Sequence, residues 1–307
     1  MDFPLIVEQV LNGLQLGILL FLLAAGLTLV FGIMDFVNLA HGSFYMLGAF
    51  FFATFFNLTE SFVLSIFIGL TATLVTGILT DILGLHNLYS RNHLDQVLAT
   101  FGLILFFNQL VQVIWPLDGL AVAMPSNLDG RINIGLGIEY PIYRFLIIAS
   151  GLFVALSLYL MVAHTRLGML IRAGASNRKM LSALGVNVKL LFSYVFGLGA
   201  ALAGLAGMLV TPIISATSGM GEQILILAFV VIVIGGIGSI RGAFIAAIIV
   251  GMIDTLGRSF LDVILLLLLP VNAAEAGGPA LSSMLTYILM AAVLFFRPEG
   301  LFPQQRR

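Results

Sequence analysis

The chain has 307 residues, of which 61% are hydrophobic and only 9% are charged. Soluble domains carry about 25% charged residues, so this composition excludes a soluble globular protein and indicates a membrane protein. The formal net charge of −1 provides no basic surface for nucleic acid. The absence of cysteine excludes disulfides, thiolate metal sites and cysteine nucleophiles.

Long apolar runs predict an all-α fold, a polytopic bundle of about eight to nine transmembrane helices that lies in membrane lipid. The N-terminus has no basic n-region, so we expect the first run to be a retained span rather than a signal peptide. No loop is long enough for another domain, which predicts one transmembrane domain over residues 1–307. The predicted spans are 9–32, 36–56, 61–84, 96–115, 142–163, 190–211, 223–239, 243–261 and 280–296.

The second predicted span, 36–56, opens with polar residues and is the candidate for a broken or re-entrant helix. Charge orients the others, because cytoplasmic loops carry an excess of Lys and Arg. Arg91, the loop 166–189, Arg241 and the basic tail are therefore placed inside. The acidic loops near 116–141, 212–222 and 270–279 are placed outside. This alternation predicts a periplasmic N-terminus and a cytoplasmic C-terminus.

The loop 166–189 carries five of the 13 Lys and Arg residues. Within it, 176–185 is predicted to form a short amphipathic helix, capped by Ser176 and ended by Gly185. Met180, Leu181 and Leu184 are expected on one side of this helix. The helix is either a handle for a cytoplasmic partner or a basic topology determinant. The candidate handle comprises Arg172, Ser176, Asn177, Arg178, Lys179, Met180, Leu181, Leu184 and Gly185.

Small residues recur four apart in the span 190–211. This spacing lets helix backbones approach closely in lipid. We interpret them as helix-packing faces rather than substrate contacts. They are Gly199, Ala203, Gly204 and Gly207.

Two glycine-interrupted polar stretches, 32–43 and 235–242, follow strongly apolar runs in the two halves of the chain. In transporters such paired discontinuities often mark the substrate path. They could equally be tight turns that end spans, and a turn can also form a wall of the path. The candidate path residues are Asn38, His41, Gly42, Ser43, Gly235, Gly236, Gly238 and Ser239.

Motifs for catalysis are missing from the sequence. It contains no phosphate loop, no zinc-binding His-Glu-x-x-His helix and no nucleophile elbow. We therefore predict no enzyme activity, no metal site and no cofactor. Among the intramembrane carboxylates, Asp35 and Asp81 are expected to be hydrated near a membrane face. Asp254 is expected to form a structural ion pair with Arg258, four residues later.

Taken together, these motifs resemble the permease subunits of bacterial ABC importers of the branched-chain amino-acid type. The short N-terminus is similar to the smaller of that family's two permeases. Two positions depart from its pattern, Asp35 and Arg241. The matching segments, in order from 26 to 302, include Asn38-Leu-Ala-His-Gly42, Met46-Leu-Gly48, Thr165-Arg-Leu-Gly168, Gly204-Leu-Ala-Gly207, Gly235-Gly-Ile-Gly-Ser-Ile-Arg-Gly-Ala243 and Arg297-Pro-Glu-Gly-Leu-Phe302.

The resemblance implies that the basic loop docks on a cytoplasmic ATPase. It also implies a homologous second permease, two ATPase subunits, a periplasmic substrate-binding protein and a location in the inner membrane. Branched-chain or other hydrophobic amino acids are the central substrates of the family, and similar subunits carry urea, short amides and aromatic acids. Two other functions stay open: an ion-coupled secondary transporter, and a passive channel for a small polar solute such as urea.

Overall fold

The structure is a computed structural model and describes residues 3–89, 91–135, 137–267 and 270–302. Its elements, in chain order, are α1 (Phe3–Met34), α2 (His41–Thr59), α3 (Phe62–Thr80), a π-helical turn (Asp81–Leu85), a 3-10 turn (His86–Leu88), α4 (His93–Ile114), β1 (Arg131–Gly135), β2 (Ile138–Pro141), α5 (Ile142–His164), α6 (Arg166–Ser176), α7 (Arg178–Ala183), α8 (Val188–Val210), α9 (Met220–Gly235), α10 (Ile240–Leu266) and α11 (Val271–Phe296).

The all-α class predicted from the sequence is confirmed. Eight helices among the described residues are long and apolar enough to cross a membrane. The predicted span 223–239 corresponds to α9, which has only 16 residues. The predicted span 36–56 begins later than expected: residues 35–40 are not helical, and α2 is continuous from His41 to Thr59. The described strands form one antiparallel pair between α4 and α5.

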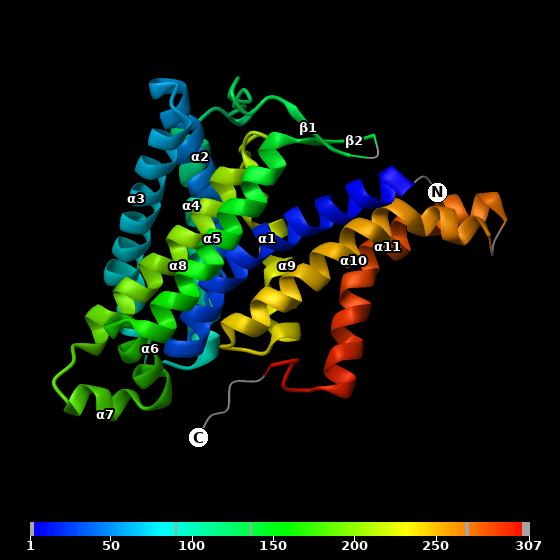
Figure 1. Ribbon diagram of the computed structural model, residues 1–307. Helices are drawn as coiled ribbons and strands as arrows, with labels where there is room; N and C mark the ends of the chain where they lie inside the picture. Colours follow the sequence, from blue (N-terminus) through cyan, green and yellow to red (C-terminus); the bar gives the residue numbers. More distant parts are fainter. Residues whose placement is uncertain (1–2, 90, 136, 268–269, 303–307) are drawn as a thin grey trace.

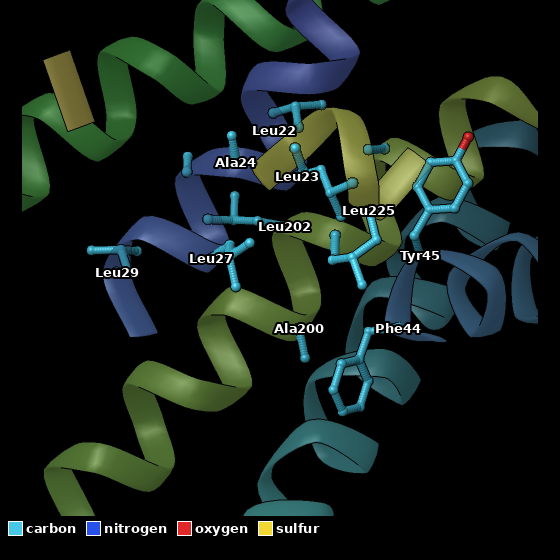
Figure 2. Packing of buried hydrophobic residues seen from close by; sticks show 14 of the residues in the cluster. Leu22, Leu23, Ala24, Leu27, Leu29, Phe44, Tyr45, Ala200, Leu202 and Leu225 are labelled. Carbon is cyan, nitrogen blue, oxygen red and sulfur yellow. The ribbon is translucent and has the colours of Figure 1, made fainter. Parts of the chain in front are cut away.

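The core of the bundle is built around α1. From Ile18 to Val30 every residue of α1 is buried, because this stretch is apolar on all sides and other helices surround it. Figure 2 shows its packing: Leu23 and Leu27 of α1 lie among Leu202 of α8 and Leu225 of α9. By contrast, α3, α4, α5 and α11 expose apolar side chains on their outer faces. These faces suit lipid or another membrane subunit.

Figure 1 shows which elements lie at each of the two ends of the bundle. The β-hairpin and the start of α1 lie at one end, and α7 lies at the other, toward which α11 runs. The basic loop 166–189 and the acidic loop 116–141 are therefore at opposite ends, as the charge alternation requires.

The small residues of α8 face three neighbouring helices, α1, α2 and α3. A Cβ atom on Gly199 would lie 3.0 Å from the main-chain oxygen of Gly26 on α1. On Gly207 it would lie 2.0 Å from the main-chain oxygen of Tyr45 on α2. At Gly204 it would lie 2.7 Å from the methyl carbon of Thr73 on α3. Ala203, between them, is fully buried.

Candidate functional site

The break between α1 and α2 is held open by α4. Asp35 has a φ of 49° and ends α1 in the left-handed region. The backbone that follows bonds to side chains: Val37 N donates to Gln96 Oε1 (3.3 Å) and Leu39 N donates to Thr100 Oγ1 (3.2 Å). Gln96 and Thr100 thus replace the helical partners that these amides would otherwise have. Neither residue is among those predicted from the sequence, although a Gln and a Thr four apart on an apolar helix are a signal.

His41, the first residue of α2, lies well inside the bundle. Its Nε2 atom is 3.1 Å from the main-chain oxygen of Leu23. Leu23 precedes Met34, the last residue of α1, by 34 − 23 = 11 residues. At 1.5 Å per residue, the imidazole of His41 therefore contacts α1 about 16 Å from that end of the helix.

The start of α9 lies against the start of α2. A Cβ atom on Gly42 would lie 2.2 Å from the main-chain oxygen of Gly221, and one on Gly221 would lie 2.1 Å from that of Gly42. Only glycine allows this approach. Near the same point Glu222 accepts a hydrogen bond from Asn108, well along α4. Two helices thus begin side by side within the bundle, which is the arrangement of discontinuous helices in transporters. Gly221 is not among the residues predicted from the sequence.

Two polar side chains sit at this junction. Asn38 is completely buried, and within the described part of the chain neither its amide nitrogen nor its amide oxygen has a hydrogen-bond partner. Ser43 is also buried. Burying an amide without hydrogen-bond partners is unfavourable by a few kcal/mol. A rearrangement of the segment, or a polar ligand that hydrogen-bonds to Asn38, would therefore stabilise the protein at this position.

The second glycine-rich stretch is a turn between α9 and α10. Gly236 and Gly238 have φ values of 98° and 85°. The C-terminal segment closes the turn: Leu301 N donates to Ile234 O (2.8 Å) and Phe302 N donates to Gly235 O (3.1 Å). These bonds occupy carbonyl groups that the end of α9 would leave unpaired.

The predicted path residues of this second stretch therefore fall into two pairs with different surroundings. Gly235 and Gly236 are buried by backbone, against Gly242 and the C-terminal segment respectively. Gly238 and Ser239 instead line a cavity of about 730 Å³ together with Arg172 and Arg241. Ser239 also caps α10, accepting from Gly242 N (3.1 Å).

The two stretches meet at one point. A Cβ atom on Gly32 would lie 2.7 Å from the Cα atom of Gly238. Asn38, His41 and Ser43 lie at the other junction, where α2 and α9 begin. The structure thus brings the two stretches into contact but divides the predicted path residues between two levels.

The predicted helix 176–185 is wrong at its beginning. Ser176 is the last residue of α6, and Asn177 is the cap of α7, its side chain accepting from Met180 N (3.0 Å). Asn and Ser are about equally favourable as N-cap residues. Because α6 continues through Ser176, the N-cap of α7 is Asn177. The left-handed Gly185 (φ 83°) follows α7, as the sequence suggests.

The apolar face of α7 also differs from the expected one. Leu181 is only 4% exposed and anchors α7 to the body of the protein, whereas Met180 is 62% exposed and Leu184 is 73% exposed. Lys179 is exposed beside them, and the exposed Arg172 on α6 donates to the main-chain oxygen of Val162. The outward apolar patch of α7 is therefore Met180 and Leu184.

Aromatic contacts connect α7 with the break after α1. The guanidinium of Arg178 lies 5.4 Å from the centre of the Phe192 ring on α8. Phe192 makes an edge contact with Tyr89 (5.5 Å), and Tyr89 makes another with Phe36 (5.8 Å), two residues before Asn38. We call Phe192, Tyr89 and Phe36 the aromatic relay. Its rings come from three distant parts of the sequence, which is why the sequence did not reveal it.

Asp81 is buried, not hydrated as expected. It accepts a hydrogen bond from Ser193 Oγ (2.6 Å) and one from the Tyr89 hydroxyl, and His86 Nδ1 lies 3.6 Å away. Burial and the adjacent carboxylate raise the pKa of Tyr89, so its hydroxyl stays protonated and donates. This cluster fixes Tyr89 between α3 and α8.

The eight long apolar helices define the class of this chain, a multi-pass membrane protein. Residues 9–294 match the family described as branched-chain amino acid transport system / permease component, and the chain belongs to that family. The match covers nearly the whole chain, and it confirms the family that the sequence motifs indicate.

Named relatives of this chain are permeases of the same kind of transport system. The high-affinity branched-chain amino acid transport system permease protein BraD of Pseudomonas aeruginosa is 28% identical, over 96% of this chain and 94% of that protein. The corresponding LivH protein of Escherichia coli is 28% identical, over 85% and 89%. The probable LivH permease of Methanocaldococcus jannaschii is 27% identical, over 92% and 88%. No solved structure matches the chain.

Proposed function

We propose that this chain is a permease subunit of an ATP-driven importer of branched-chain or other hydrophobic amino acids. It forms half of the translocation path and docks an ATPase through residues 172–185. The chain lies in the inner membrane, and its partners are a homologous second permease, two cytoplasmic ATPases and a periplasmic substrate-binding protein. Residues 1–307 act as one permease domain, and ATP hydrolysis occurs in the partner subunits.

The observation that carries the proposal is the pair of exposed apolar side chains on α7. Met180 and Leu184 project from a short capped helix, beside the exposed Lys179. Exposed apolar side chains next to a charged residue are typical of an anchor that fills a pocket on a partner protein. The positive-inside rule puts α7 in the cytoplasm, with the C-terminus on the same side and the N-terminus outside.

The aromatic relay supplies a route from docking to transport. Closure of the ATPases moves α7, and the movement passes through Phe192, Tyr89 and Phe36 to the segment 35–40. Asn38, His41, Gly42 and Ser43 form the inner part of the path or its cytoplasmic gate. Gly238 and Ser239 form the part nearest the cytoplasm, while Gly235 and Gly236 act through the shape of the turn.

The two alternative functions make different demands. An ion-coupled transporter needs deep carboxylates that can bind protons or sodium ions, and Asp254 is the deep candidate. A passive channel needs no docking helix. Neither gives a reason for the exposed patch of α7.

Replacing Leu184 with Asp tests the docking assignment. An unpaired carboxylate at an interface is unfavourable by about 3–5 kcal/mol, which weakens docking by more than about 100-fold. Ser182→Asp is the matched control, because Ser182 is also exposed on α7. We expect the ATPases to copurify with the Ser182→Asp variant and not with the Leu184→Asp variant. Normal copurification and normal stimulated ATPase activity with Leu184→Asp would make the assignment wrong.

A further inference from the structure

A second cavity, of about 470 Å³, lies between α9, α10 and α11, with Tyr45 of α2 at its wall. Its lining combines apolar side chains, such as Met220 and Leu227, with the charged pair Asp254 and Arg258. Gln223, Ser283 and Thr286 add uncharged polar groups. The cavity therefore offers both apolar and polar surface.

The charged pair is well formed and asymmetric in exposure. Arg258 Nε lies 2.9 Å from Asp254 Oδ2, and a terminal Arg258 nitrogen lies 3.0 Å from Oδ1. The Asp254 side chain is 8% exposed and the Arg258 side chain is 59% exposed. Charges within a transmembrane segment are unfavourable, and those that persist usually face a polar cavity. The helix spacing explains why the two residues meet, but it does not explain why both of them line a cavity.

The cavity lies where α2 and α9 begin. Met220 and Gln223 belong to the first turn of α9, beside Gly221, and Tyr45 follows the start of α2 by one turn. Asp254 follows Ile240, the first residue of α10, by 254 − 240 = 14 residues. It therefore lies about 21 Å along α10 from the α9–α10 turn. The cavity thus lies at the level of the junction between α2 and α9, and it opens at the surface of the bundle beside the exposed side chains of Arg258 and Ser283.

The chemistry of the lining selects its occupant. Arg258 can hold a carboxylate through two parallel hydrogen bonds, and Asp254 can accept from an ammonium group. A zwitterion thus exchanges one ion pair for two without adding net charge to the membrane interior. Met220, Ile224 and Leu227 provide apolar contact for its side chain. An anionic lipid would need an excess of positive charge, and this pair is neutral.

We propose that this cavity is a transit site for a zwitterionic hydrophobic amino acid, with Asp254 and Arg258 holding its two charged groups. The inference rests on the proposed function, which supplies the substrate class. In the empty state the two side chains satisfy each other, so the site stays stable without substrate. Because that pair competes with the substrate, binding is weak enough for passage.

Thiol protection tests the site without any turnover. Ser283→Cys places a single thiol in the cavity, since the chain has no native cysteine. The assembled importer, in nanodiscs and without nucleotide, is treated with a small water-soluble thiol reagent. Saturating leucine should slow the modification. Isopentylamine and 4-methylpentanoate carry the same side chain with one charge each, and they should protect about tenfold less well because each loses one charge-assisted contact. Asn133→Cys, on the exposed strand β1, should show no protection.

Variants of the pair separate binding from folding. Arg258→Gln in the Ser283→Cys background should abolish protection by leucine, and Arg258→Lys should restore part of it. The double variant Asp254→Asn, Arg258→Gln should assemble with the ATPases and lose protection. Protection that survives in the double variant, equal protection by all three compounds, or an unreactive Ser283→Cys thiol would each overturn the proposal. Failure of the proposed function appears differently, as uptake by the unmodified complex that is indifferent to ATP.

Discussion

His41 and Leu23 join the first residue of α2 to the middle of α1, with the imidazole Nε2 atom 3.1 Å from the Leu23 main-chain oxygen. This contact places the start of a helix inside the bundle rather than at its end. Transporters tolerate such a break only where protein or a water-filled cavity surrounds it. The completely buried Asn38 lies three residues before it.

Cysteine substitution tests whether this region is a path. Asn38→Cys and Ser239→Cys should react with a small water-soluble thiol reagent, at rates that change when ATP is trapped in the assembled complex. The reason is that a gate must alternate between closed and hydrated states. Ala203→Cys is the matched control, because Ala203 is fully buried between helices and should be unreactive in every state. Unreactive thiols at 38 and 239, or rates independent of nucleotide, would leave these segments as turns only.

Replacing Gly207 with Leu tests the packing of α8. Tyr45 already occupies the space of a Cβ atom at this position, so the larger side chain must push α2 away. Overpacking is unfavourable by about 1–3 kcal/mol or more. We expect a loss of expression or assembly, measured as intact protein in the membrane. Gly102→Leu is the control, because a Cβ atom there meets no other atom within 4 Å. A well-assembled Gly207→Leu variant with altered substrate preference would place this face on the path.

Tyr89 tests the aromatic relay. Tyr89→Leu removes the ring that links Phe192 with Phe36, whereas Tyr89→Phe keeps the ring and removes only the hydroxyl donated to Asp81. We expect Tyr89→Leu to dock ATPases normally but to transport fewer substrate molecules per ATP. Tyr89→Phe should keep a near-normal ratio. Equal ratios in both variants and the unmodified complex would show that the relay carries no movement.

Hydropathy was sufficient to predict the class and the approximate helices, because burial in lipid demands long apolar runs. It failed where distant residues decide the outcome. Asp81 lies near a span end in the sequence, yet Ser193 and Tyr89 bury it. The partners of the segment 35–40, Gln96 and Thr100, lie some 60 residues away.

In the candidate site, too, local features were predictable from the sequence and features set by distant residues were not. Local preference predicted Gly185 at the end of the docking helix, and its φ is left-handed. Ser176 and Asn177 are both good caps, so local preference could not choose between them. A helical wheel grouped Leu181 with Met180 and Leu184, but only tertiary packing turns Leu181 inward. Gly221 stood in no motif, and its need for glycine arises from Gly42.

Reconstituted uptake tests the central claim most directly. The chain is placed in proteoliposomes with and without its second permease and ATPases, and accumulation of labelled leucine, delivered by the binding protein, is measured. We expect accumulation only when the partner subunits and ATP are present, with loss of accumulation for Leu184→Asp. Accumulation by this chain alone under a proton or sodium gradient, or simple equilibration without ATP, would contradict the account.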